Sequence, residues 1–145
     1  MKLTNNTSQI LFLAVLMIFT LMAAISFANE GSDTTANGWN APETAKAVEN
    51  PLTLDNKAVE KGKTLFAQQC ATCHGNSGKG DGPAGKYLGK PLPDFTGAEF
   101  QDQTDGEIFW KITTGKAPMP TFEKMLTDEQ RWQVINFIRS LSTED

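Results

Sequence analysis

The stretch Cys70-Ala71-Thr72-Cys73-His74 decides most of what can be inferred from this sequence. It holds both cysteines and the only histidine among 145 residues. The C-x-x-C-H spacing is typical of covalent haem attachment, because each thiol can add to one vinyl group and the adjacent imidazole is then held beneath the ring. We therefore expect one covalent haem c, with Cys70 and Cys73 as thioether attachments and His74 as an iron ligand.

Three other interpretations of these residues are weaker. Structural zinc needs four Cys or His ligands, and the chain has three. A thioredoxin-like C-x-x-C begins a helix beside a βαβ unit, whereas here a predicted helix precedes the motif. A Cys70–Cys73 disulfide is feasible in an oxidising compartment, but it leaves His74 without a role.

The segment just before the motif carries the signals of a helix. From Asp55 to Gln69 the apolar residues fall on overlapping helical turns, and Asp55 is available as an N-cap. Gly62 inside this helix costs about 1 kcal/mol relative to Ala. We therefore expect a packing reason for it, such as a second helix pressed against the face that carries Gly62 and Phe66.

Two capping boxes predict further helices after the motif. Thr104-Asp105-Gly106-Glu107 opens one that ends near Gly115, and Thr127-Asp128-Glu129-Gln130 opens the last. In the last helix the 3.6-residue pattern places an apolar stripe toward the core and three polar residues toward solvent; the stripe is Trp132, Ile135, Phe137, Ile138 and Leu141, and the solvent residues are Arg131, Gln133 and Arg139. Because no segment alternates as a strand, we predict an all-α fold.

Between these helical regions lies a long loop, Gly75 to Gly97, with seven glycines and three prolines. This composition forbids long regular structure. Loops of that length are usually functional or disordered. Four apolar side chains give this one the means to fold over a bound group: Tyr87, Leu88, Leu92 and Phe95.

Two methionines are candidates for the sixth iron position. Met119 lies in Gly115-Lys116-Ala117-Pro118-Met119-Pro120, where the flanking prolines fix the backbone and preclude a regular helix. Met125, just before the last helix cap, is better explained by core packing. We favour Met119, because a stiff loop can aim its sulfur at the iron.

The N-terminal part of the chain divides into two segments before the domain at 55–145. Residues 1–28 hold a single charged side chain, an apolar run and a small-residue end, which predicts an export signal. The apolar run is also long enough to remain as an uncleaved membrane anchor, at about 20 residues, and no cysteine is available for lipid anchoring. Residues 29–54 are polar and indicate a linker or an extended arm.

The composition and charge of the chain bear on its domain number and on its binding partners. An apolar fraction of 39% over 145 residues fits one compact domain. The formal net charge is −4, and no run of basic residues occurs. This charge pattern argues against nucleic acid as a partner, since phosphate binding needs clustered Lys or Arg.

From Asp55 to Ser142 the ordered motifs resemble those of the class I cytochromes c. The resemblance implies three to four helices around one haem, with the first and last helices crossing at Gly62 and Phe66 against Val134 and Phe137. It also implies that the Pro83 carbonyl accepts the Nδ1 proton of the proximal histidine, which would orient the imidazole. The motifs are Gly62-Lys63-x-x-Phe66, Cys70-x-x-Cys73-His74-Gly75, Gly80-Asp81-Gly82-Pro83, Thr114-Gly115-x-x-x-Pro118-Met119-Pro120 and Trp132-x-Val134-x-x-Phe137-Ile138-Arg139-x-Leu141.

These observations predict an electron carrier rather than an enzyme. With His74 and Met119 both bound, iron has no open site for oxygen or peroxide, and thioether ligation raises the potential. The expected setting is the periplasm or another extracytoplasmic space, with donor and acceptor proteins of respiratory or other oxidoreductase complexes. Two alternatives stay open: an electron-entry subunit of a larger oxidoreductase, and a haem enzyme or sensor in which Met119 is displaced.

Overall fold

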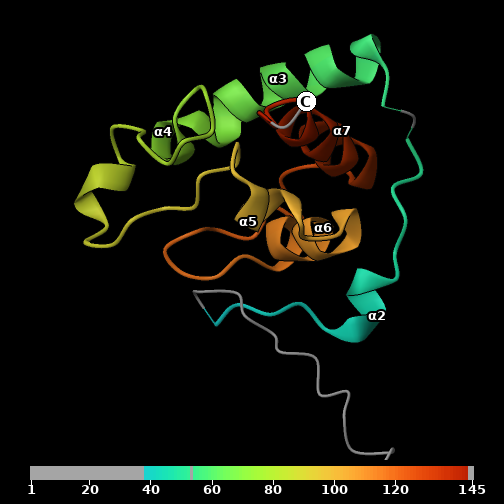
Figure 1. Cartoon of the computed structure of the whole chain (residues 1–145), viewed down its shortest axis with the longest axis horizontal. Helices are drawn as coiled ribbons and strands as arrows, with labels where there is room; N and C mark the ends of the chain where they lie inside the picture. The colour runs from blue at the N-terminus through green and yellow to red at the C-terminus, as the bar shows by residue number, and fades with distance from the viewer. Residues whose placement is uncertain (1–37, 53, 144–145) are drawn as a thin grey trace, which may run out of the picture. The chain divides into compact units, whose positions relative to one another are not determined.

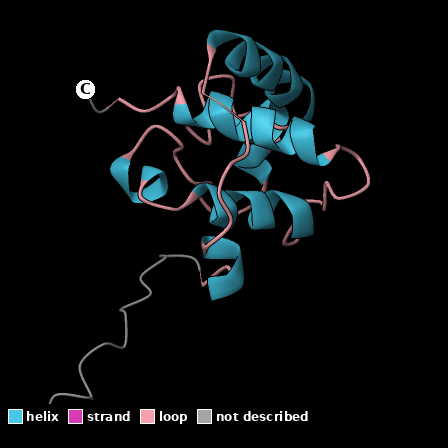
Figure 2. Cartoon of the chain, turned by 90° about the vertical axis from the view of Figure 1, so that its right-hand side faces the viewer, coloured by secondary structure: helices cyan, strands magenta, loops and turns pink. Residues whose placement is uncertain are grey.

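The structure is a computed structural model that describes residues 38–52 and 54–143 (Figure 1). The export signal expected at 1–28 and the start of the arm lie outside the described residues. In the described part every regular element is helical, and the backbone pairs only once as an isolated bridge, between Lys116 and Met119 (Figure 2). The all-α prediction is confirmed. The elements are α2 (Glu43–Lys46), α3 (Asn56–Gln69), α4 (Ala71–His74), η1 (Gly85–Tyr87), α5 (Ala98–Gln101), α6 (Asp105–Thr114) and α7 (Asp128–Arg139).

The three longer helices begin at the predicted caps. The Asp55 side chain accepts a hydrogen bond from the Ala58 backbone N–H at 2.7 Å, which starts α3. Thr104 and Thr127 each form a complete capping box, with Glu107 and Gln130 respectively, at the starts of α6 and α7. Each box satisfies two backbone N–H groups that have no partner within the helix.

The glycine inside α3 allows that helix to cross α7 at close range. A Cβ added to Gly62 would lie 1.8 Å from the Gln133 carbonyl oxygen, so only glycine fits. One turn further on, the rings of Phe66 and Phe137 pack with centroids 5.1 Å apart, and Val134 beside them is 1% exposed. The predicted helix crossing is confirmed.

Helix α7 is buried on more faces than its sequence pattern indicates. Arg131 and Gln133 were expected to face solvent, yet they are 3% and 6% exposed, and the Arg139 side chain is 19% exposed. The prediction was wrong because α7 packs against α3 and also against α6. Polar side chains can be buried there because they are hydrogen-bonded, for example Arg131 to backbone carbonyls and Arg139 to Asp105.

The part of the predicted arm that the structure describes is attached to the domain. Helix α2 packs on α6, where a Cβ on Gly106 would lie 2.0 Å from the Ala45 carbonyl oxygen. Asn50 donates hydrogen bonds to Asp105 at 3.0 Å and to Asn136 at 2.8 Å. This attachment was not predicted, nor was the short α5, since four-residue helices leave little periodic signal. Within the described ranges, no helix has both the length and the apolar character needed to cross a membrane.

Candidate haem-binding site

The three residues of the attachment motif are placed by the end of α3 and by the single turn of α4. Cys70 closes α3, with its N–H donating to the Phe66 carbonyl at 2.8 Å, and the His74 N–H donates to the Cys70 carbonyl at 2.9 Å. Cys73 lies between them in the same turn. All three residues are half-buried; Cys70 packs against the hydrophobic core and the His74 ring against Phe95.

The glycine-rich loop after the motif is hydrogen-bonded back onto α4. The N–H groups of Gly80, Gly82 and Ala84 donate to the carbonyls of His74, Cys73 and Thr72 at 2.8, 3.1 and 2.9 Å. A Cβ on Gly82 would lie 2.6 Å from the carbonyl oxygens of Ala71 and Cys73. The loop was predicted to fold over a bound group, and its glycines let it approach the attachment motif itself.

His74 stands in an apolar environment. Its ring stacks on Phe95 with centroids 4.6 Å apart, and burial lowers its pKa to about 4, so the imidazole is neutral at pH 7. Neutral imidazole is the form that binds metals. Its Nδ1 atom is buried and has no hydrogen-bond partner among the described residues. The predicted bond from Nδ1 to the Pro83 carbonyl stays a prediction; Phe95 was expected only as one of four apolar side chains of the loop.

The cysteines do not suit the competing chemistries. Burial, followed by the charge of Cys73, raises the pKa of Cys70 to about 12, whereas a redox-active C-x-x-C needs a depressed thiol pKa. Both cysteines are free thiols. Among the described residues, no three His, Cys, Asp or Glu side chains gather as a metal site. Two unpaired thiols one turn apart, followed by a neutral imidazole with an orphaned Nδ1, fit a covalently attached haem.

The Met119 loop is closed against the end of α6. The Met119 N–H donates to the Lys116 carbonyl at 2.9 Å, and the Thr121 hydroxyl donates to the Thr113 carbonyl at 2.6 Å. Phe122 continues the closure through its N–H to the Ile112 carbonyl at 3.2 Å. The Met119 side chain is partly buried against the same hydrophobic core that Cys70 contacts.

Met125 does not pack in the core, contrary to the prediction. It is 56% exposed, while its neighbours Phe122 and Leu126 are 4% and 6% exposed. The turn before α7 directs these two apolar residues inward and leaves the third outside. Sequence periodicity could not identify which of the three faces the core, because the turn is too short to establish a period.

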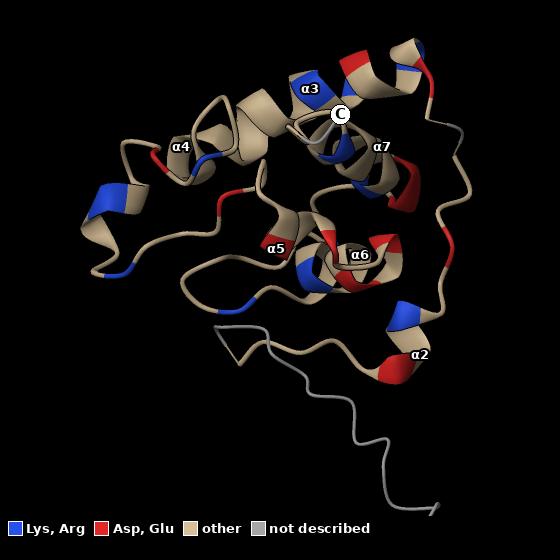
Figure 3. Ribbon diagram, in the orientation of Figure 1, with Lys and Arg blue, Asp and Glu red and all other residues tan. Residues whose placement is uncertain are grey.

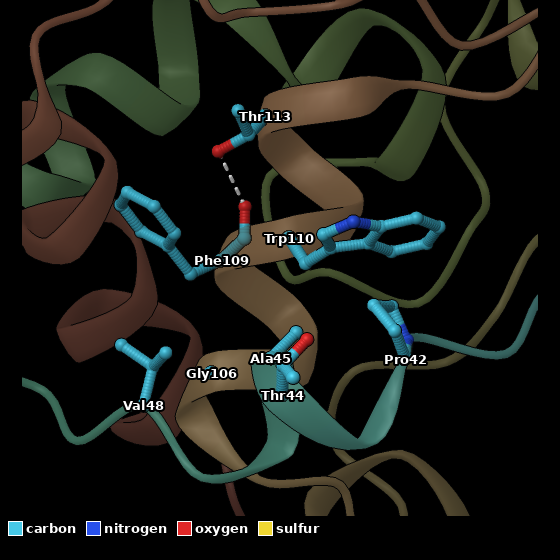
Figure 4. A pocket seen from close by; sticks show the side chains of 8 residues that line it. All are labelled: Pro42, Thr44, Ala45, Val48, Gly106, Phe109, Trp110 and Thr113. Atoms are coloured by element: carbon cyan, nitrogen blue, oxygen red, sulfur yellow. Dashed lines mark hydrogen bonds between the residues drawn. The ribbon is translucent and has the colours of Figure 1, made fainter.

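A separate apolar pocket of about 330 Å³ lies between α2 and α6 (Figure 4). Trp110 extends over Pro42 at its edge. None of the predicted haem-binding residues lines this pocket. The lining residues are Pro42, Thr44, Ala45, Val48, Gly106, Phe109, Trp110 and Thr113.

Comparison with known proteins agrees with this site. Residues 57–138 match the family model described as cytochrome c oxidase, cbb3-type, subunit III. The chain belongs to this family of c-type cytochromes. Covalently bound haem c follows from that membership, and so does the assignment of the helical fold to the class I cytochromes, which structural neighbours support. Its relatives include a subunit of a cbb3-type oxidase, cytochromes c6 and cytochrome c subunits of bc1 complexes.

Two curated relatives differ greatly in size. The cbb3-type cytochrome c oxidase subunit CcoP of Azospirillum brasilense is 36% identical over 80 residues, 54% of this chain and 27% of the relative. Cytochrome c6 of Rippkaea orientalis is 36% identical over 87 residues, 58% of this chain and 71% of the relative. The cytochrome thus matches about a quarter of a large subunit and most of a small cytochrome.

Among solved structures, too, the cytochrome matches part of one long chain and nearly all of a small one. In the reducing HAO-like protein complex Kustc0457/Kustc0458 of Kuenenia stuttgartiensis, one chain aligns with a TM-score of 0.57 and 31% identity, covering 66% of this cytochrome and 50% of that chain. The c-type cytochrome KustC0563 aligns with a TM-score of 0.50 and 31% identity, covering 57% of this cytochrome and 98% of that chain.

Proposed function

We propose that this cytochrome carries single electrons between redox proteins outside the cytoplasm, through one haem c whose iron His74 and Met119 would bind. One haem follows from one C-x-x-C-H motif. One observation carries the proposal: Cys70 of the attachment turn and Met119 of its hydrogen-bonded loop pack against the same hydrophobic core.

Each site residue has a distinct part in this proposal. Haem iron, when bound, supplies a one-electron change between its ferric and ferrous states. Cys70 and Cys73 would hold the group by thioether bonds, and the neutral His74 would supply a nitrogen ligand. Met119 would supply a soft sulfur ligand, which would leave no iron position open for a small substrate.

The ligation is tested by spectroscopy of the ferric holoprotein. We expect a sulfur-to-iron charge-transfer band that is lost in Met119→Ala. Met125→Ala is the matched control and should keep the band, because Met125 is exposed. A wild-type protein without the band, or loss of the band in Met125→Ala instead, contradicts the His74/Met119 assignment.

Covalent attachment is tested separately. Haem staining on a denaturing gel should persist in the wild type and disappear in the Cys70→Ala/Cys73→Ala double variant. If the wild-type protein loses its haem stain under denaturing conditions, thioether attachment is wrong.

A second candidate role is a fixed electron-entry subunit of a larger oxidoreductase. The names of two matched proteins, an oxidase subunit and a component of an HAO-like complex, favour it. Figure 3 shows Lys on η1 and in the loop after it, and residues of both charges on α2 and α6. Salt-washed membranes distinguish the roles: a free carrier is released into the soluble extracytoplasmic fraction, whereas a subunit or an anchored form copurifies with the membrane.

A further inference from the structure

The buried Arg131 of α7 fastens the outgoing end of the Met119 loop. Its guanidinium Nη1 donates to three backbone carbonyls, those of Phe122 at 3.3 Å, Glu123 at 3.2 Å and Leu126 at 2.9 Å. Nη2 is paired with the Asp128 carboxylate. Residues 122–126, which we call the stem, begin three residues after Met119 and connect its loop to α7. The Arg131 side chain therefore binds three backbone carbonyls of the stem.

The guanidinium is held in a fixed position itself. Arg131 is 3% exposed, and its Cζ lies 4.9 Å from the centroid of the Phe109 ring, which in turn stacks on Trp132 at 4.0 Å. Its planar fork loses less freedom per hydrogen bond than a lysine ammonium does. Arg131 therefore links the stem to both α6 and α7.

One part of this arrangement lowers its contribution to stability. The Arg131 Nε atom is buried with no hydrogen-bond partner in the described part of the chain. Leaving that N–H of a buried charge unpaired costs free energy. The Arg131 hydrogen bonds do restrict the conformation of residues 122–126, and so they fix where the Met119 loop ends.

We propose that Arg131 is a positioning residue for the Met119 ligand, and this rests on the proposed His74/Met119 ligation. By restricting the stem, Arg131 lowers the entropy that the loop must lose when its sulfur binds iron. Loss of the Arg131 hydrogen bonds to the stem leaves the attachment turn intact but makes the Met119 sulfur easier to displace.

The test measures how tightly added imidazole binds the ferric holoprotein, because imidazole must displace Met119. Arg131→Lys should bind imidazole about tenfold more tightly, as expected for the loss of a charge-assisted hydrogen bond. Arg139→Lys is the matched control. Arg139 also lies on α7, and it donates to the Gln101 carbonyl at 2.7 Å and to Asp105 at 2.7 Å, away from the Met119 stem. It should bind imidazole within about twofold of the wild type.

A second pair of variants covers the case in which Arg131→Lys does not fold. Asp128→Asn removes the charge that pairs with the Arg131 guanidinium. Because the Asp128 side chain is 82% exposed, the effect should be small, with imidazole binding about twofold tighter. Its control is Glu129→Gln, which removes the same charge from the first turn of α7 and should leave imidazole binding unchanged.

The outcomes separate the two proposals. If the wild type lacks the sulfur-to-iron band, the proposed ligation fails, and the role of Arg131 fails with it. If the band is present but imidazole affinity is the same in Arg131→Lys and wild type, or rises equally in Arg139→Lys, only the role of Arg131 is overturned. An unchanged affinity in Asp128→Asn overturns it when Arg131→Lys cannot be obtained.

Discussion

The crossing of α3 with α7 and the loop that covers α4 both depend on glycines, but they are held together differently. At the crossing, Gly62 lets two helices bury Phe66 and Phe137 against each other. At the loop, Gly82 lets one backbone hydrogen-bond to another, and its nearest neighbours are the carbonyls of Ala71 and Cys73. The comparison indicates that apolar burial stabilises the domain while backbone hydrogen bonds set the geometry of the site.

The largest effect is expected where the crossing is blocked. Gly62→Val should lower the free energy of unfolding of the holoprotein by more than about 4 kcal/mol, because its Cβ would overlap the Gln133 carbonyl. In denaturant, haem absorbance and far-UV circular dichroism should shift together, since the whole domain depends on the crossing. Gly97→Val is the control, with its nearest atom 3.9 Å away. Comparable stability of the Gly62 and Gly97 variants would contradict this account.

Removing the aromatic ring at the crossing tests burial without a steric clash. Phe66 is 1% exposed and contacts both Phe95 and Phe137. Phe66→Ala should cost about 3 kcal/mol in the free energy of unfolding. Phe66→Leu, which keeps most of the volume, should cost roughly half as much. Equal costs for the two variants would mean that cavity formation is not the cause.

A smaller and more local effect is expected in the loop. Gly82→Ala should lower the free energy of unfolding by about 2 kcal/mol, because the added methyl group separates the loop from α4. Haem absorbance should change at a lower denaturant concentration than circular dichroism, since the loop can open before the helices unfold. Gly97→Ala should leave the two transitions coincident. Coincident transitions in Gly82→Ala would show that loop and crossing unfold as one unit.

The smallest effect is expected at the attachment of the arm. Asn50→Ala removes hydrogen bonds to Asp105 and Asn136 and should cost about 1 kcal/mol in thermal or chemical unfolding. Asn76→Ala, at an exposed position in the glycine-rich loop, should have no measurable effect. If both variants have wild-type stability, the Asn50 hydrogen bonds add nothing to the stability of the domain.

Much of the fold could be predicted because its signals are local. The N-cap at Asp55 and the capping boxes at Thr104 and Thr127 depend on side chains that bond within four residues, so short sequence patterns identify them. Gly62 was identified by its cost inside a helix. Of the candidate site, the attachment motif was identified from its spacing, whereas the roles of Met119 and Pro83 stay predictions.

The errors fall where a distant segment changes the environment. Arg131 and Gln133 match a solvent face of an isolated helix, but α7 has neighbours on more than one side. Met125 and Leu126 are adjacent and similar in character, and only the path of the turn buries one and exposes the other. Residues 38–52 are too polar to predict their packing on α6, which depends on Gly106 and Asn50.

Local sequence is enough to identify the attachment motif of this cytochrome, because covalent attachment needs particular side chains at a fixed short spacing, which no other segment of the chain supplies. It also determined where the main helices begin. The packing of the helices, by contrast, sets which polar groups of α7 are buried, how the glycine-rich loop hydrogen-bonds to α4 and which carbonyls of residues 122–126 Arg131 contacts. These features join residues far apart in sequence, and their energies exist only once the helices have packed.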